Sequence, residues 1–297
     1  MRTLGVIPAR LASTRLPRKV LRQVAGRPLL AWVVDAARAC PQLDQVLVAA
    51  DSEEVVALCR QLGFPVQLTS PDLPSGTDRV HAIAQLVDAE IYVNIQGDEP
   101  LLRPEHIAAL LRPFAHPDAA ITTLRVPCTP ENIANPNAVK VVTAADGRAL
   151  YFSRATIPYD RDAMGDCHPE RSATHTAMGD CHPERSATRI PTGDCHPERS
   201  ATRAVEEPVL SLSKEPASGL EPPTLYWKHI GLYAYRKAAL NSFPTLPASR
   251  LERAERLEQL RFLENGIDIH VALTPFDTIG VDTEADLRLV ESILLRR

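Results

Sequence analysis

Short apolar runs alternate with amphipathic stretches over most of the chain. The apolar runs are typical of buried strands, and they predict strands over residues 3–8, 45–50, 91–96, 120–126 and 139–143. The amphipathic stretches predict helices over residues 29–40, 52–62, 78–87 and 104–114. This alternation favours an α/β fold whose mainly parallel sheet is covered by helices on both faces. Ligands of such sheets bind at the carboxyl ends of the strands, so we expect the chemistry just after the strands that begin at residues 3, 45 and 91.

A repeat interrupts this pattern in the second half of the chain. The motif Gly-Asp-Cys-His-Pro-Glu-Arg-Ser-Ala-Thr begins at residues 165, 179 and 193, and a segment rich in proline, serine and glutamate follows it. With proline in every copy and few large apolar residues, the segment cannot bury enough surface to offset its ordering entropy. We therefore predict that residues 163–224 form an inserted, mostly disordered loop. The self-similarity is typical of a translated nucleotide repeat. The Cys-His pairs leave a zinc site open as an alternative, although their spacing is not the usual one.

Length and charge limit the classes of protein that fit. The chain has 297 residues and a net charge of −4, which suits one large α/β domain or two small ones and does not favour wholesale binding to nucleic acid or an anionic membrane. Its apolar runs are too short to span a bilayer, and its start does not resemble a signal peptide. Cys40, Cys59 and Cys128 stand singly, as thiols do in a reducing compartment. We expect a cytoplasmic protein.

Basic residues gather in the loop after the first predicted strand. Arg10, Arg15, Arg18 and Lys19 fall there, with hydroxyl groups at Ser13 and Thr14 between them. Guanidinium forks and ammonium groups bind phosphate oxygens, so the loop predicts a phosphate clamp. No GxxxxGK[ST] motif is present, which excludes a P-loop ATPase. The alternative is a solvated loop whose charges serve solubility.

Two carboxylates follow apolar segments far apart in the chain. Asp98 comes after the third predicted strand, and Asp282 precedes a final predicted helix. Carboxylates at these places suit Mg²⁺ beside a triphosphate. The alternative for Asp98 is that it caps the helix that begins near residue 104. The alternative for the second segment is an ordinary helix start, because Thr283 and Asp286 have capping-box spacing.

Small residues open another predicted helix in the segment from Ser75 to Arg79. Exposed backbone N–H groups there could bind an anion or the edge of a base, and Arg79 is expected to point back toward the same pocket. The alternative is a loop in which Thr77 is the N-cap.

Eight short motifs in order make the chain resemble one family. They are Ile-Pro-Ala-Arg at residue 7 with Ser-Thr-Arg-Leu-Pro at residue 13, Ser-Gly-Thr-Asp-Arg at 75, Gln-Gly-Asp-Glu-Pro at 96, Asn-Pro-Asn-Ala-Val-Lys at 135, Leu-Tyr-Phe-Ser-Arg at 150, His-Ile-Gly-Leu-Tyr at 229, Leu-Glu-Gln-Leu-Arg at 257 and Gly-Val-Asp-Thr at 280. In these motifs the sequence resembles the 3-deoxy-manno-octulosonate (Kdo) cytidylyltransferases. The resemblance implies a single domain over residues 1–297 with the three-layer, Rossmann-like nucleotidyltransferase fold, a mixed, mainly parallel sheet and a small dimerisation region. It also implies a homodimer that uses Mg²⁺.

The resemblance further implies a reaction in which the 2-hydroxyl of Kdo attacks the α-phosphate of CTP and releases pyrophosphate, giving CMP-Kdo for lipopolysaccharide biosynthesis. The roles that it implies fall into three groups. For CTP they are Ala9, Arg10, Ser13, Arg15, Lys19, Ser75, Gly76 and Arg79; for Kdo they are Arg79, Gln96, His229, Tyr233, Glu258 and Gln259; and for Mg²⁺ they are Asp98 and Asp282. Lys19, Asp98, Arg10 and Asp282 are expected to carry the catalysis.

Three alternatives stay open at this stage. His229 and Arg79 suit the carboxylate of the sugar, but His229 also fits a core histidine whose hydrogen bonds are satisfied within the protein. The acceptor could instead be a nine-carbon acidic sugar such as sialic acid. The third alternative is a non-catalytic relative that keeps the fold and binds nucleotide, the insertion having disabled the chemistry.

Overall fold

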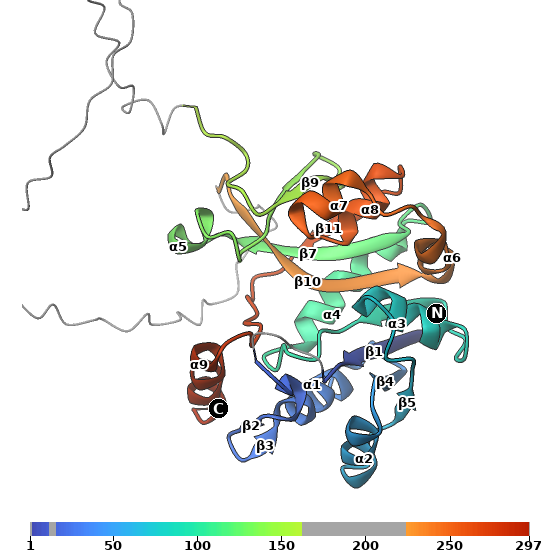
Figure 1. Cartoon of the computed structure of the whole chain (residues 1–297). Helices are drawn as coiled ribbons and strands as arrows, with labels where there is room; N and C mark the ends of the chain where they lie inside the picture. Colours follow the sequence, from blue (N-terminus) through green and yellow to red (C-terminus); the bar gives the residue numbers. More distant parts are fainter. Residues whose placement is uncertain (1, 12–15, 162–223, 297) are drawn as a thin grey trace, which may run out of the picture. The chain divides into compact units, whose positions relative to one another are not determined.

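A computed structural model of the chain describes residues 2–11, 16–161 and 224–296. One compact unit comprises Met1–Tyr159 and Gly219–Arg297, and a second comprises Asp160–Ser218. The predicted insertion, residues 163–224, lies outside the described residues except for Thr224. All that follows concerns the first unit (Figure 1).

A mixed sheet of nine strands forms the centre of this unit. Seven strands follow one another in the order β11-β7-β10-β6-β1-β4-β5, while β8 pairs with β10 and β9 pairs with β8. Of these seven, only β10 runs against the others, because it is antiparallel to both β6 and β7. The prediction of a mixed, mainly parallel sheet is therefore confirmed. The strands are β1 (Thr3–Ala9), β4 (Gln45–Ala50), β5 (Val66–Leu68), β6 (Ile91–Asn94), β7 (Ile121–Pro127), β8 (Lys140–Thr143), β9 (Ala149–Ser153), β10 (Trp227–Arg236) and β11 (Ile269–Leu273), with a separate hairpin of β2 (Gln23–Val24) and β3 (Arg27–Pro28).

Helices cover both faces of the sheet. Side chains of α1, α2 and α4 pack into one hydrophobic cluster, and those of α3, α6 and α8 pack into another on the opposite face. The helices are α1 (Leu29–Arg38), α2 (Glu53–Gln61), α3 (Gly76–Ala84), α4 (Pro104–Leu111), α5 (Pro130–Ile133), α6 (Lys237–Ser242), α7 (Arg250–Glu255), α8 (Gln259–Glu264) and α9 (Glu284–Leu294), and the 3-10 turns are η1 (Lys19–Leu21), η2 (Arg112–Ala115) and η3 (Phe243–Thr245). The result is the predicted three-layer α/β arrangement.

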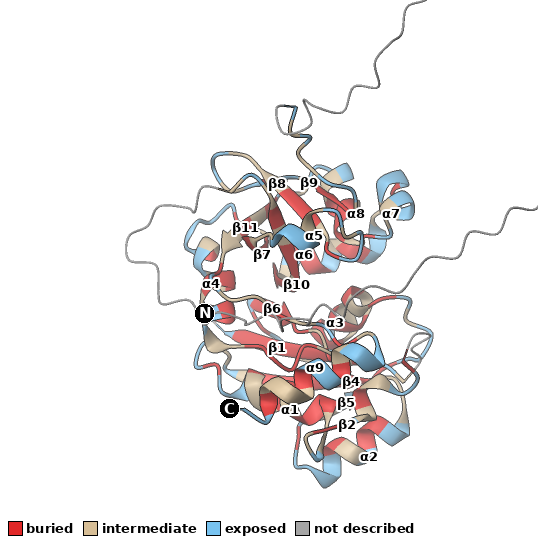
Figure 2. Cartoon of the chain, turned by 90° about the vertical axis from the view of Figure 1, so that its left-hand side faces the viewer, coloured by how far each residue is buried: buried red, intermediate tan, exposed pale blue. Residues whose placement is uncertain are grey.

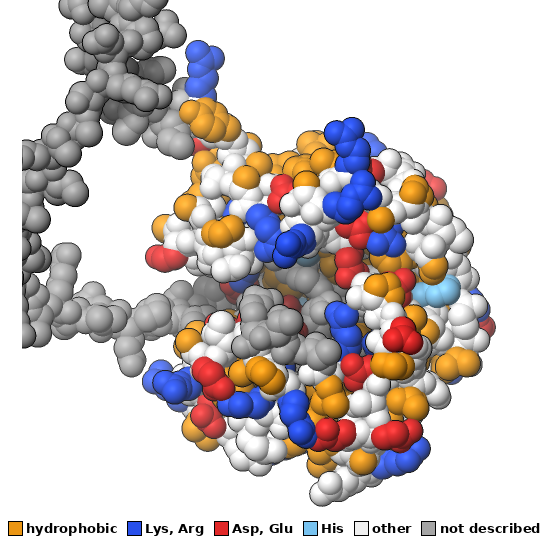
Figure 3. Space-filling view, in the orientation of Figure 1, with side chains coloured by type: hydrophobic (Ala, Val, Ile, Leu, Met, Phe, Trp, Pro, Cys, Tyr) orange, Lys and Arg blue, Asp and Glu red, His pale blue; other side chains and the backbone are white. Residues whose placement is uncertain are grey.

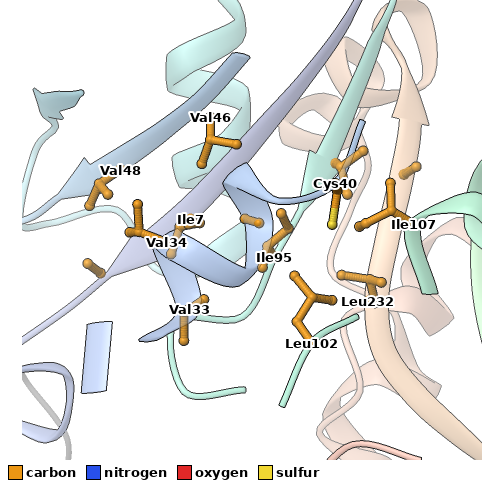
Figure 4. Packing of buried hydrophobic residues seen from close by; sticks show 14 of the residues in the cluster. Ile7, Val33, Val34, Cys40, Val46, Val48, Ile95, Leu102, Ile107 and Leu232 are labelled. Carbon is orange, nitrogen blue, oxygen red and sulfur yellow. The ribbon is translucent and has the colours of Figure 1, made fainter. Parts of the chain in front are cut away.

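Successive residues of the central strands feed the two clusters in turn. Ile7 of β1 and Val48 of β4 belong to the cluster shown in Figure 4, whereas Val6 and Leu47 belong to the one on the other face. Buried residues accordingly lie along the strands in Figure 2. A strand that is buried on both faces is apolar at nearly every position, which is why these strands stand out in the sequence.

One predicted helix start and two predicted helix caps differ from the structure. Helix α3 begins at Gly76 rather than at residue 78, because the Ser75 side chain caps it by accepting a hydrogen bond from the Asp78 backbone N–H at 3.1 Å. The alternative that Thr77 is the cap is therefore wrong. The N-cap of α4 is Arg103, so the alternative that Asp98 caps this helix is wrong as well.

Candidate active site

A cavity of about 640 Å³ lies at the carboxyl ends of β1 and β6, where the sequence placed the ligand site. Its wall combines the residues after these strands, the start of α3, the middle of β10, and the segments at 256–259 and 278–283. Eight of the predicted site residues line it: Arg10, Gly76, Gln96, His229, Tyr233, Glu258, Gln259 and Asp282. The volume is in the range of ordinary small-molecule sites.

The Lys19 ammonium group joins the two predicted metal ligands. Its Nζ lies 2.9 Å from Asp282 Oδ1 and makes a closer hydrogen bond to Asp98 Oδ2. The Lys19 side chain is only 13% exposed. Burial by itself would lower the pKa of Lys19, but the charges and hydrogen bonds of the two carboxylates outweigh it and raise the pKa. The three side chains thus form a compact charged group beside the cavity, and Asp282 also lines the cavity itself.

Asp282 reaches this group through residues 274–283, which connect β11 to α9 and are called the linker here. The Thr274 N–H donates to the Arg125 carbonyl at 3.0 Å, and the Val281 N–H donates to the Asp98 carbonyl at 2.9 Å. Between these points the Lys228 ammonium group pairs with Asp277 at 2.8 Å. The linker is therefore held at several points before it delivers its carboxylate.

The linker ends in the predicted helix start. The Thr283 side chain accepts from the Asp286 N–H, and the Asp286 carboxylate accepts from the Thr283 N–H at 2.8 Å. The capping box therefore exists together with the contact between Asp282 and Lys19, and the two interpretations of this segment are compatible.

The environment of the His229 imidazole favours its neutral form. It is buried against the ring of Phe152, with 5.0 Å between ring centroids, and its Nε2 lies 3.0 Å from Thr123 Oγ1. Burial, with a smaller contribution from the charge of Lys228, lowers the pKa of His229 to about 3. A neutral imidazole would contact the carboxylate of the sugar through a hydrogen bond rather than through a positive charge. His229 lines the cavity and is also buried with a hydrogen-bond partner inside the protein, so the substrate-binding role and the core-histidine alternative are compatible.

The other residues predicted for the sugar surround His229 with polar atoms. Gln96 Nε2 donates to the Gly231 carbonyl at 3.2 Å, and Glu258 Oε2 accepts from the Thr77 hydroxyl at 2.9 Å. Burial raises the pKa of Glu258. Gln259 Nε2 is buried and has no hydrogen-bond partner among the described residues. Such a donor is available to a ligand hydroxyl.

The residues predicted for the nucleotide are brought together only in part. Arg10 lines the cavity and donates to the Pro74 carbonyl at 3.1 Å, and Gly76 lines the cavity beside it. Ala9 is buried at the end of β1, where its carbonyl accepts from the Asp51 N–H at 3.2 Å. Ser75 is occupied as the cap of α3. Ser13 and Arg15 lie outside the described residues.

Arg79 does not reach the cavity. Its side chain is completely buried. Its Nη1 donates one hydrogen bond to the Thr69 hydroxyl and another, at 3.0 Å, to the Ser70 carbonyl. The expectation that it points into the pocket is wrong, because the face of α3 that carries it packs into the interior rather than toward the cavity.

Sequence reasoning assigned no substrate-binding role to several residues of the cavity wall. Glu99, Thr77 and Lys228 line the cavity, as do Asn132, Asn135 and Asn137. Burial, reinforced by the charge of Asp98, raises the pKa of Glu99 to about 8. Glu99 directly follows Asp98 in the Gln-Gly-Asp-Glu-Pro motif, and Lys228 directly precedes His229, so proximity to a predicted site residue was the available signal.

The surface charge and the remaining side chains show no other candidate site in the described part of the chain. Basic and acidic side chains are interspersed on the face in Figure 3, and neither sign covers a continuous area. In the described part of the chain, no helix is long and apolar enough to cross a membrane, and no group of three or more His, Cys, Asp or Glu side chains is placed to hold a metal. Cys40, Cys59 and Cys128 are free thiols.

Comparison with known proteins agrees with the resemblance in the motifs. The family model described as cytidylyltransferase matches residues 4–269. The chain is 56% identical to the 3-deoxy-manno-octulosonate cytidylyltransferase of Acidobacterium capsulatum, over all of this chain and 98% of that protein. It is 48% identical to the protein of the same name from Koribacter versatilis, over all of this chain and 92% of that protein.

A solved structure shares the architecture over its whole length. It is a CMP:2-keto-3-deoxy-manno-octonic acid synthetase complexed with CTP, 31% identical, with a TM-score of 0.77 over all of this chain and 99% of that one. An inositol-1-phosphate CTP transferase from T. maritima, 12% identical with a TM-score of 0.58, shares the fold alone. The chain belongs to the 3-deoxy-manno-octulosonate cytidylyltransferase family.

Proposed function

We propose that this protein transfers CMP from CTP to Kdo, giving CMP-Kdo and pyrophosphate. The observation that carries the proposal is the cavity in which the family's motifs meet. It is lined by Arg10 from the end of β1, Gln96 from the end of β6, His229 from β10 and Asp282 from the linker. In the transfer, the anomeric hydroxyl of the sugar attacks the α-phosphate and pyrophosphate leaves. Such a reaction needs charge neutralisation and alignment more than a covalent intermediate.

The basic residues serve the triphosphate side. The Arg10 guanidinium group is exposed at the cavity and can bind phosphate oxygens in two places. The Lys19 ammonium group, held by Asp98 and Asp282, supplies a second positive charge for the triphosphate. Both positive charges stabilise the charge that develops on the departing pyrophosphate.

Asp98 and Asp282 fit the Mg²⁺ that the family implies. Their carboxylates already converge on one cation, the Lys19 ammonium group, so a cation fits between them. Two carboxylates leave the remaining coordination positions to phosphate oxygens and water, which is the arrangement that Mg²⁺ favours. When bound, Mg²⁺ would polarise the α-phosphate and lower the pKa of the attacking hydroxyl.

Neutral polar groups serve the sugar side. His229, Tyr233, Gln96, Glu258 and Gln259 line the cavity and offer hydrogen bonds to hydroxyl groups. Since burial favours the uncharged form of His229, the carboxylate of the sugar would be bound by hydrogen bonds here rather than by this imidazole as a cation.

The cellular context is proposed from the family. We propose that the enzyme is a cytoplasmic homodimer whose product enters lipopolysaccharide biosynthesis. Strand β9 pairs only with β8 among the described residues, and its Leu150 side chain is 63% exposed, which suits a subunit contact. Sedimentation equilibrium of the full-length protein tests the dimer, and a monomer at micromolar concentration would contradict it.

The test of function is pyrophosphate release from CTP. Release should require both Kdo and Mg²⁺ and should be far slower with sialic acid in place of Kdo. Faster release with sialic acid would favour the alternative acceptor. No release from well-folded protein that still binds CTP would favour the non-catalytic relative.

A further inference from the structure

We propose that Glu99 is a further binding residue for the acceptor sugar, with its carboxyl group hydrogen-bonded to a hydroxyl of Kdo. The inference rests on the proposed function, and it adds Glu99 to the residues that recognise the acceptor.

The first observation is a buried polar atom without a partner. Glu99 is 9% exposed and lines the cavity, and its Oε2 has no hydrogen-bond partner among the described residues. A polar atom that is withdrawn from water without a partner is costly, so a ligand that supplies the missing hydrogen bond gains from it. The other oxygen, Oε1, faces the β10 side of the cavity, near Gly231.

The second observation is the glycine opposite this carboxyl group. A Cβ added to Gly231 would lie 3.8 Å from Glu99 Oε1 and 3.9 Å from Gln96 Cγ. Gly231 falls where the pairing of β10 with β7 shifts register, between Ile230 and Tyr233. Bulges of this kind often lie beside active sites. The lack of a side chain at Gly231 leaves room for a ligand group against the carboxyl.

The surroundings favour a hydroxyl over a metal or a phosphate. Lys19 joins Asp98 to Asp282, and within the described ranges no third acidic side chain is placed with them to form a metal site. A carboxyl group gives a triphosphate no positive charge to neutralise its own, whereas its oxygens can accept a hydrogen bond from a sugar hydroxyl. Glu99 and Gln96 both lie beside Gly231, and Gln96 is assigned to the sugar.

The experiment compares steady-state kinetics of the full-length enzyme and three variants. Glu99→Ala should raise KM for Kdo by about 2- to 10-fold, which corresponds to the loss of one hydrogen bond between neutral groups, and should leave KM for CTP unchanged within error. Gly231→Ala should fold normally, because its methyl group meets only ordinary van der Waals contacts, and should raise KM for Kdo by crowding the Glu99 carboxyl. Glu105→Gln, on an exposed position of α4, is the matched control and should leave both KM values unchanged.

Singly deoxygenated Kdo analogues separate recognition from a structural role. The wild-type enzyme should discriminate against the analogue that lacks the contacted hydroxyl, and Glu99→Ala should lose that discrimination. Two results would overturn this inference alone, provided that the wild-type enzyme is active. One is an unchanged KM for Kdo in both the Glu99 and Gly231 variants, and the other is unchanged discrimination between the analogues in Glu99→Ala. Wild-type enzyme that binds CTP but shows no Kdo-dependent turnover would overturn the proposed function and this inference with it.

Discussion

The Lys19 ammonium group lies between the two carboxylates that we propose for Mg²⁺, so its removal should leave room for the metal ion there. In Lys19→Met the aliphatic part of the side chain is kept and the ammonium group is lost, leaving Asp98 and Asp282 facing each other without a shared positive charge. Exposed ion pairs contribute about 0–1 kcal/mol, and breaking a buried pair costs about 3–5 kcal/mol. The carboxylate side chains are 25% and 37% exposed, so we expect a loss of about 1–3 kcal/mol in the free energy of unfolding.

The assay is urea denaturation with EDTA or with Mg²⁺, without nucleotide. Mg²⁺ at ten times its dissociation constant should return about 1.4 kcal/mol to Lys19→Met, because the ion can occupy the place that the ammonium group left. The wild type should gain less, since Lys19 competes for the carboxylates. Lys237→Met, which removes a more exposed pair with Asp88, is the control and should show a small loss and no response to Mg²⁺. If Mg²⁺ stabilises the wild type more than Lys19→Met, the assignment of this pair as the metal site is wrong.

Three further predictions concern other parts of the site. The pKa of His229 is about 3 in the folded protein against 6.5 ordinarily, so as the pH falls the unfolded chain gains a proton near pH 6.5 that the folded chain does not gain. The contribution of His229 to stability is therefore full above pH 6.5 and is lost below it. In denaturant titrations the wild type should lose ~2 kcal/mol more of its free energy of unfolding than His229→Gln between pH 7 and pH 5. Asp277→Asn breaks the ion pair with Lys228 that ties down the linker, so it should weaken Mg²⁺-dependent CTP binding by calorimetry several-fold, and unchanged binding would show that the other linker contacts suffice. Gly97→Ala places a Cβ 2.8 Å from the Pro8 carbonyl, so it should destabilise the protein by about 1–3 kcal/mol in thermal unfolding, and a wild-type Tm would contradict this close approach.

The central strands could be predicted from sequence almost to the residue. The prediction for 45–50 coincides with β4, and that for 3–8 is one residue shorter than β1. These strands are buried on both faces, so each is a continuous apolar run bounded by polar residues. The place of β10 in the sheet could not be predicted in the same way, because a strand's neighbours and direction depend on pairing between segments far apart in the chain.

The residues of the candidate site could likewise be predicted only in part. Motif order and the ends of the strands indicated Arg10, Gln96, Asp98 and Asp282, since the carboxyl ends of parallel strands meet at one edge of a sheet. Arg79 was misplaced, because local sequence predicts that a helix begins near it but not which face of that helix packs into the interior.

The amino-acid sequence by itself determined the α/β class, the strands of the core and the family, and it singled out the two carboxylates that we propose for Mg²⁺. Only the tertiary structure decided that Lys19 pairs with Asp282, 263 positions away in the sequence, as well as with Asp98, that burial favours the neutral form of His229, and that Glu99 is buried beside Gly231. The reason is physical: strand and helix patterns depend on near neighbours, whereas charge state, burial and hydrogen-bond partners depend on which distant segments the fold brings together.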